Sequence, residues 1–254
     1  MDISTSKDQG ILTIEFNRPE KKNAITAAMY QSLADTLNDA ENDHAVRAIL
    51  IRGKPEVFTA GNDLQDFLLH PPVDIDAPVF QFMKALSRSS KPVVAAVAGN
   101  AVGIGTTLLM HCDLVYAADN AKFALPFAQL GLCPEFCSSV LLARTAGYAR
   151  TAEKLMLGEA FDAREACEMG LVCKVLPAGE LHAFAHMQAA KLVALPASSI
   201  RVTKRLMKNH EAEMLGVRMR EEVEYFGKML TSPEAKEAFS AFLEKRKPDF
   251  TKFG

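Results

Sequence analysis

Three glycine-containing turns hold the residues of this chain whose types and spacing could do chemistry. They cover residues 59–63, 99–105 and 130–139, and each leads into a predicted helix. A glycine turn at a helix N-terminus leaves main-chain N–H groups unpaired, next to the positive end of the helix dipole. The N–H groups of Ala60 and Ile104 are such donors. If they converge, they form an oxyanion hole that stabilises an enolate oxygen.

Glu135, in the third turn, is the candidate acid/base. It stands in the string PEFCSS of residues 134–139, and a glutamate can remove a proton from a substrate and return it. The alternative is an acidic residue that only complements the dipole of the following helix. Tight packing is likewise the alternative role of the glycine turns. A dinucleotide or P-loop site is not predicted, because residues 99–105 lack the third glycine and no Walker lysine follows.

The elements that must position these turns alternate between strands and helices. Residues 11–16 alternate as a half-buried strand does, 46–51 form a second strand, and 92–97 are apolar on both faces, as in a parallel sheet. Thr26 is predicted to cap a helix, and residues 113–117 form a further strand. This order predicts an α/β fold. The other predicted helices cover residues 64–70, 79–87, 106–111, 135–146, 148–157, 162–169, 179–194, 196–208, 210–230 and 233–246, with one strand at 171–176.

The composition restricts the possible partners. The chain has 254 residues, of which 49% are hydrophobic and 24% charged, and its net charge is −2. Such a balance gives no electrostatic case for nucleic acid or an anionic membrane surface. No apolar run approaches the length of a membrane span. We therefore expect neither a nucleic-acid nor a membrane partner.

The cysteines favour a reducing compartment. The five cysteines form no Cys-x-x-Cys pair and have no histidine at ligand spacing, so we expect free thiols and no metal site. The polar N-terminal segment does not resemble a signal peptide, and the C-terminus is not a peroxisomal address of the Ser-Lys-Leu type. A cytoplasmic location is expected.

Two strings of the chain resemble the signature segments of the crotonase family, the enoyl-CoA hydratase/isomerase superfamily. They are FTAGNDL at residues 58–64, and KPVVAAVAG at 91–99 with its continuation to Asp113. The resemblance implies a ββα-spiral core with an acyl-CoA site over residues 1–195, and a C-terminal helical region, 196–254, that packs a homotrimer or hexamer. It also implies acyl-CoA thioester substrates, with CoA entering as part of the substrate and no separate cofactor, and a place in fatty-acid and lipid metabolism.

The resemblance also suggests residue roles. The family's oxyanion hole falls on the N–H groups of Ala60 and Ile104, and Lys21 and Lys22 lie where the family binds the CoA phosphates and adenine. An exposed pair of loop charges is the alternative for the two lysines. Asp63 is expected to cap the helix that starts at Leu64. The predicted substrate- and CoA-binding residues are Lys21, Lys22, Ala24, Ala60, Gly61, Asn62, Asp63, Leu64, Ile104 and Gly105.

The type of reaction depends on carboxylates. Hydratases of the family use two glutamates, at positions that are Thr107 and Phe127 here. The PEFCSS string is similar to that of peroxisomal-type 3,2-enoyl-CoA isomerases, whose catalytic glutamate falls on Glu135. The prediction is an isomerase that moves a double bond from C3 to C2 by a single-carboxylate proton shuttle. A hydratase or related enolate-forming enzyme, and an acyl-CoA-binding protein without catalysis, remain alternatives.

Apolar side chains in the C-terminal helices are predicted to be exposed and to pack the subunits together. These residues are Met207, Met214, Val217, Val223, Phe226, Leu230, Phe239 and Phe242.

Overall fold

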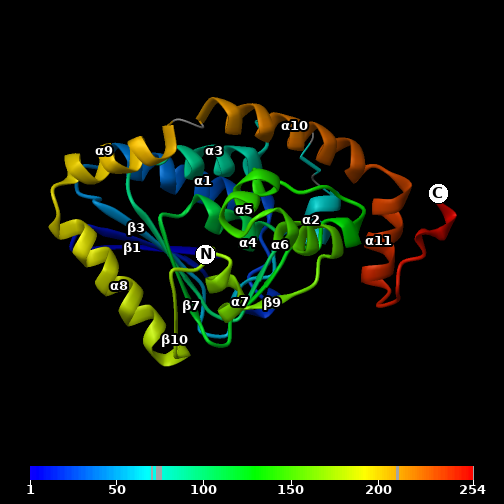
Figure 1. Cartoon of the computed structure of the whole chain (residues 1–254), viewed down its shortest axis with the longest axis horizontal. Helices are drawn as coiled ribbons and strands as arrows, with labels where there is room; N and C mark the ends of the chain where they lie inside the picture. Colours follow the sequence, from blue (N-terminus) through cyan, green and yellow to red (C-terminus); the bar gives the residue numbers. More distant parts are fainter. Residues whose placement is uncertain (70, 73–75, 210–211, 254) are drawn as a thin grey trace.

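Two β-sheets form the centre of the computed structural model, which describes residues 1–69, 71–72, 76–209 and 212–253 (Figure 1). The larger sheet has six strands, all parallel to their neighbours except the antiparallel first pair. In spatial order the strands are β1 (Ile3–Asp8), β2 (Ile11–Phe16), β3 (Ala48–Arg52), β5 (Val93–Val97), β7 (Leu114–Ala118) and β10 (Lys174–Leu176).

The smaller sheet is built by the same path of the chain. After β3, β5 and β7 the chain leaves the larger sheet and adds one short strand to the smaller one. That sheet holds β4 (Val57–Thr59), β6 (Asn100–Val102), β8 (Lys122–Ala124) and β9 (Phe161–Asp162), in this order. The expected α/β class and the repeating strand–strand–helix path are confirmed.

The larger sheet is covered on both faces, which explains its nearly continuous apolar strands. Side chains alternate along each strand, so Ile49 and Val93 join the cluster that contains α1 (Ala27–Asn42) and α3 (Pro78–Arg88). Leu50 and Val94 point the other way, toward α8 (Ala178–Ala194). The predicted cap of α1 is confirmed, since the Thr26 side chain accepts the N–H of Met29.

The remaining helices follow the predicted order. In Figure 1, α9 and α10 run one after the other along the upper edge, and α11 leads to the C-terminal residues. Their bounds are α2 (Leu64–Leu69), α4 (Ile104–Thr107), α5 (Ser138–Ala146), α6 (Tyr148–Ala152), α7 (Ala163–Glu168), α9 (Ala197–Lys208), α10 (Ala212–Leu230) and α11 (Pro233–Leu243). A 3-10 turn, Leu108–His111, follows α4, and a π-helical turn, Glu153–Leu157, follows α6.

The structure differs from the sequence-based expectation at several elements. Helix α5 begins at Ser138 rather than at residue 135, because Phe136 and Cys137 have left-handed backbones with φ of 56° and 59°. The strands of the smaller sheet were not predicted, since each is only two or three residues long. Strand β1 was not predicted because all its residues after Ile3 are polar. The predicted helices 64–70 and 210–230 include residues 70, 210 and 211, which lie outside the described part of the chain.

The predicted docking face is only partly exposed. Met207, Met214, Val217 and Phe242 are exposed, with 43–63% of their surface accessible. For Phe226, Leu230 and Phe239 the prediction is wrong, because these side chains pack into the chain's own core. Assembly into a trimer or hexamer stays a prediction, as does the boundary after residue 195. Within the described residues, no helix is long and apolar enough to cross a membrane.

Candidate active site

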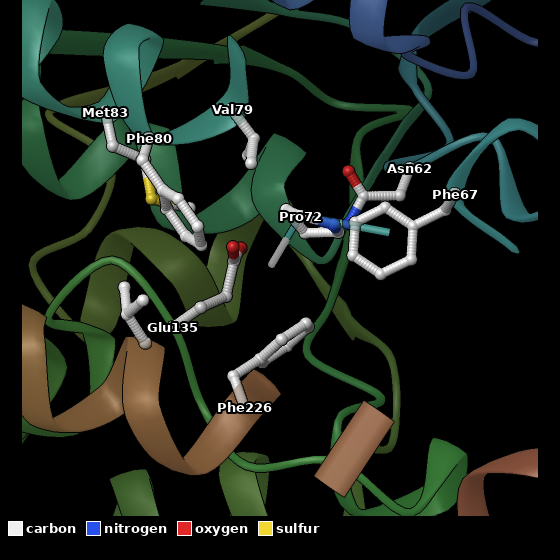
Figure 2. A pocket seen from close by; sticks show the side chains of 9 residues that line it. Asn62, Phe67, Pro72, Val79, Phe80, Met83, Glu135 and Phe226 are labelled. Atoms are coloured by element: carbon white, nitrogen blue, oxygen red, sulfur yellow. The ribbon is translucent and has the colours of Figure 1, made fainter. Parts of the chain in front are cut away.

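A narrow apolar pocket encloses Glu135 (Figure 2). The pocket lies between α2, α3, α10 and the turn after β4. Figure 2 shows the Glu135 carboxylate between Val79 and Phe80 on one side and Phe226 on the other. The residues that line the pocket are Asn62, Phe67, Pro72, Val79, Phe80, Met83, Glu135, Val223 and Phe226.

Burial tunes Glu135 for proton exchange near neutral pH. The residue is only 7% exposed, and burial raises the pKa of Glu135 to about 8. The Thr107 hydroxyl donates to Oε1 at 3.1 Å, which opposes this rise, and the charge of Glu222 adds to it. A carboxyl group with such a pKa can both take up and release a proton under physiological conditions.

The turn around Glu135 fixes its direction. The main-chain oxygen of Glu135 accepts the N–H of Ser138 at 3.0 Å and its hydroxyl at 2.6 Å. Between them, Phe136 and Cys137 have positive φ, a conformation that non-glycine residues rarely adopt. The chain therefore reverses sharply just before α5.

The two glycine turns lie against each other. Gly61 has a φ of 87°, and a Cβ atom there would lie 2.7 Å from the carbonyl oxygen of Val102. Glycine is thus needed at this position for both its conformation and its close approach. This contact brings the turn at residues 60–62 next to the turn at 102–104, as the oxyanion-hole hypothesis requires.

One predicted donor is wrong. The N–H of Ala60 donates to the carbonyl oxygen of Lys22 at 2.9 Å, so its hydrogen is already used. Within the described part of the chain, no acceptor is recorded for the N–H groups of Asn62 and Ile104. Asn62 lines the pocket, and Ile104 is the first residue of α4. The candidate donor pair is therefore Asn62 and Ile104.

Tyr30, on α1, holds the side chain of Asn62 by a hydrogen bond. Its hydroxyl donates to the side-chain oxygen of Asn62. Burial, with the charge of Glu135 as a second cause, raises the pKa of Tyr30 well above its ordinary value. The phenol therefore stays protonated and keeps this hydrogen bond.

The predicted CoA-binding turn packs against residues 57–60. The side-chain amide of Asn23 donates to the carbonyl oxygens of Val57 and Phe58 at 3.2 and 3.0 Å, and the Thr59 hydroxyl donates to the carbonyl oxygen of Asn23. This places Lys22 beside Ala60. Lys21 and Lys22 are exposed, as charged groups that meet phosphates would be.

Other predicted residues have mainly structural partners. Asp63 accepts from Arg18 at 2.7 Å and from the N–H groups of Gln65 and Asp66, so it caps α2 as predicted. The carbonyl oxygen of Ala24 accepts from Arg18 as well. Leu64 packs against the core and Gly105 is buried, with no room for a Cβ beside Thr59.

Thr107 and Tyr30 are site residues that the sequence did not indicate. Thr107 was noted only as the absence of a carboxylate, yet its hydroxyl meets Glu135. Phe127, at the second hydratase position, is buried with 5% exposed. Among the described residues, no group of three His, Cys, Asp or Glu side chains could hold a metal ion.

Comparison with known proteins gives the family. Residues 6–252 match the family described as Enoyl-CoA hydratase/isomerase. The chain belongs to this family. A solved enoyl-CoA hydratase/isomerase from Pseudoalteromonas atlantica T6c has a TM-score of 0.95 and 38% identity, over 99% of this chain and 100% of that one.

Curated relatives within the family have more than one activity in their names. Enoyl-CoA delta isomerase 2 of Rattus norvegicus is 36% identical over 250 residues, which are 96% of this chain and 64% of the relative. The chain thus spans just under two thirds of that relative's length. A probable enoyl-CoA hydratase of Mycobacterium leprae is 35% identical over 243 residues, which are 95% of this chain and 94% of the relative. Family membership therefore leaves the type of reaction to the site residues.

Proposed function

We propose that the protein is an acyl-CoA isomerase that moves a double bond of an enoyl-CoA from C3 to C2, with Glu135 as its acid/base. The observation that carries this proposal is a single carboxylate in an apolar pocket. Among the described residues that line it, Glu135 is the one carboxylate. Thr107 supports that group instead of supplying a second one.

The proposed reaction uses two groups of residues. The thioester oxygen accepts the N–H groups of Asn62 and Ile104, which stabilise the negative charge of a dienolate. Glu135 removes a proton from C2, and the electron pair of that C–H bond moves into the thioester. The protonated Glu135 then returns a proton to C4, which leaves the double bond between C2 and C3. One carboxyl group is enough for both steps.

Hydration of the double bond requires a functional group that the described lining residues do not supply. Water addition needs a second group that positions and activates the water molecule. Phe127 cannot exchange a proton, and Thr107 is already bonded to Glu135. A hydratase therefore fits the lining less well than an isomerase does.

For the CoA moiety and the assembly we propose the family's arrangement. Lys21 and Lys22 would meet the phosphates of CoA, and the chain would form a trimer or hexamer through exposed residues such as Met214 and Val217. Light scattering tests the assembly, and a monomer at micromolar concentration would contradict it.

One assay tests the reaction type. The purified protein is given a 3-enoyl-CoA and, separately, a 2-enoyl-CoA, each with and without a coupled hydroxyacyl dehydrogenase. We expect the kcat/KM of isomerisation to exceed that of hydration by about 10²-fold or more, since one proton-transfer group contributes about that much. Comparable values for the two reactions would show that the isomerase assignment is wrong.

A further inference from the structure

Glu222, on α10, is a buried carboxylate outside the pocket lining. It is 6% exposed. One of its oxygens accepts the N–H of Cys137 at 2.6 Å, and the other accepts the hydroxyl of Ser139. These two residues flank the start of α5, where main-chain N–H groups lack partners within the helix. A C-terminal helix therefore holds the turn that directly follows Glu135.

The peptide unit between Phe136 and Cys137 is held at both ends. Glu222 binds its N–H, while its carbonyl oxygen lies 2.8 Å from Nε2 of His111. Because a carbonyl oxygen only accepts, Nε2 must carry the hydrogen. Burial lowers the pKa of His111 to about 3, so the ring stays neutral. The His111 ring also stacks on the ring of Phe136, with 3.7 Å between the centroids.

The contacts of Glu222 and His111 with this peptide act on a strained segment. Non-glycine residues rarely adopt a left-handed backbone, because Cβ then lies too close to the following carbonyl oxygen, yet Phe136 and Cys137 adopt it in succession. Such conformations persist only where the surroundings impose them. Glu135 comes directly before this segment, so a rotation of the Phe136–Cys137 peptide would carry the carboxylate away from its place in the pocket.

The charge of Glu222 also acts on Glu135 directly, without the peptide between them. After burial and the Thr107 hydrogen bond, it is the remaining cause of the shifted pKa of Glu135, and it raises that pKa. Tyr30 and Cys133 also face Glu135, and both stay neutral because burial raises their pKa values. Burial raises the pKa of Glu222, while the hydrogen bonds from Ser139 and Cys137 and the charge of Arg218 oppose this rise and favour the ionised form.

We propose that Glu222 is a positioning residue for the reaction: from the C-terminal helix α10 it fixes the Phe136–Cys137 peptide, and so the place of the Glu135 carboxyl group in the pocket. The inference rests on the proposed isomerase function. It gives α10 a role in catalysis that the predicted role of residues 196–254 in subunit packing does not include.

Two variants of Glu222 distinguish the effect of side-chain length from the effect of side-chain charge. Glu222→Asp keeps the charge but draws the carboxylate back by one methylene. Glu222→Gln keeps the length, because its amide oxygen can accept the Cys137 N–H and its NH₂ can donate to Ser139, but it removes the charge. Glu224→Asp and Glu224→Gln are matched controls on the same helix, since Glu224 is exposed and pairs only with Lys228 among the described residues.

We expect Glu222→Asp to lower kcat about tenfold or more, the scale of a misplaced catalytic group, with KM nearly unchanged. Glu222→Gln should retain more of the plateau kcat. It should move the protonation midpoint of Glu135 down by about half a pH unit or more, because a neutral amide does not repel the carboxylate. The Glu224 variants should change neither quantity.

The midpoint is read by isotope-edited infrared titration of the Glu135 carboxyl group, assigned with Glu135→Gln. This reading needs no substrate, so it decides on Glu222 even if the wild-type protein isomerises nothing, a result that would refute the proposed function alone. The proposal would be overturned if the Glu222→Asp protein turned over at the wild-type rate. It would also be overturned if Glu222→Gln left the protonation midpoint of Glu135 unchanged.

Discussion

The candidate active site has two sides that the chain builds in different ways. The donor side, residues 60–62 and 102–104, presents main-chain N–H groups, and its geometry comes from glycine conformations and the contact between Gly61 and Val102. The carboxylate side, residues 135–139, presents one side chain on a left-handed segment that contains no glycine. That segment is held by Glu222 and His111, which are 85 and 25 residues away along the chain.

The difference predicts where each side is vulnerable. The donor side should tolerate changes of side chain but not of backbone conformation, because its chemistry lies in the main chain. The carboxylate side should respond to side-chain changes at distant positions, because hydrogen bonds from those positions impose its conformation. Three substitutions test this contrast.

Gly103→Val should have the largest effect on the donor side. Gly103 has a φ of 54° and precedes Ile104, yet a Cβ atom there would meet nothing within 4 Å. The valine therefore disturbs the backbone rather than crowding a neighbour, and it should displace the Ile104 N–H. We expect kcat to fall about 10²-fold, the usual loss for one oxyanion donor.

Gly147→Val is the matched control for this substitution. Gly147 also has a positive φ and open space around a Cβ atom, but it lies at the far end of α5 and does not precede a candidate donor. It should show a similar loss of stability with normal turnover. A folded Gly103→Val protein with turnover within about threefold of wild type would remove Ile104 from the mechanism, because a lost donor costs far more.

Glu135→Gln should raise the stability of the protein at alkaline pH. The pKa of Glu135 is higher in the folded protein, about 8, than its ordinary value of 4.5. The folded state therefore binds more protons than the unfolded state in this window, and the wild type loses stability as pH rises through it. At pH 9 the variant should gain roughly 2–4 kcal/mol in free energy of unfolding, and near pH 4 almost nothing.

Denaturant unfolding of both proteins at the two pH values measures this difference. Glu224→Gln, at an exposed position, serves as the control and should change the free energy of unfolding little at either pH. An equal stability of Glu135→Gln and wild type at pH 9 would mean that Glu135 is not held in a desolvated site.

Thr107→Val should have the smallest effect of the three. The Thr107 hydroxyl stabilises the ionised carboxylate, so its loss should raise the pKa of Glu135 further above 8. The kcat/KM profile should then shift to higher pH, with a loss of about tenfold or less at pH 7. Thr151→Val is the control, because the buried hydroxyl of Thr151 has no recorded partner among the described residues. A pH profile that does not move would exclude the hydrogen bond from the tuning of Glu135.

The same contrast explains what the sequence could predict. The donor side lies in two short strings whose glycines and apolar strands are visible in the sequence, and both turns were located correctly. The sequence could not show that the Ala60 N–H is unavailable, because no spacing reveals that it donates to the carbonyl oxygen of Lys22.

On the carboxylate side, the sequence indicated Glu135 but not its environment. Thr107 lies 28 residues from Glu135, and Glu222 lies on a helix that was predicted only to pack subunits. Phe226, on the same helix, was expected at the surface and instead lines the pocket. Helical periodicity gives the apolar face of a helix but not which part of the molecule that face covers.

Turnover of Glu135→Gln shows whether Glu135 alone moves the proton. Initial rates of isomerisation of a 3-enoyl-CoA are compared for wild type and variant, with CoA binding measured by calorimetry to show that the site is intact. We expect kcat to fall by about 10²-fold or more, as for the loss of a general base, with CoA binding largely kept. A variant that binds CoA and isomerises the substrate within about threefold of the wild-type rate would contradict it, because loss of the base costs far more.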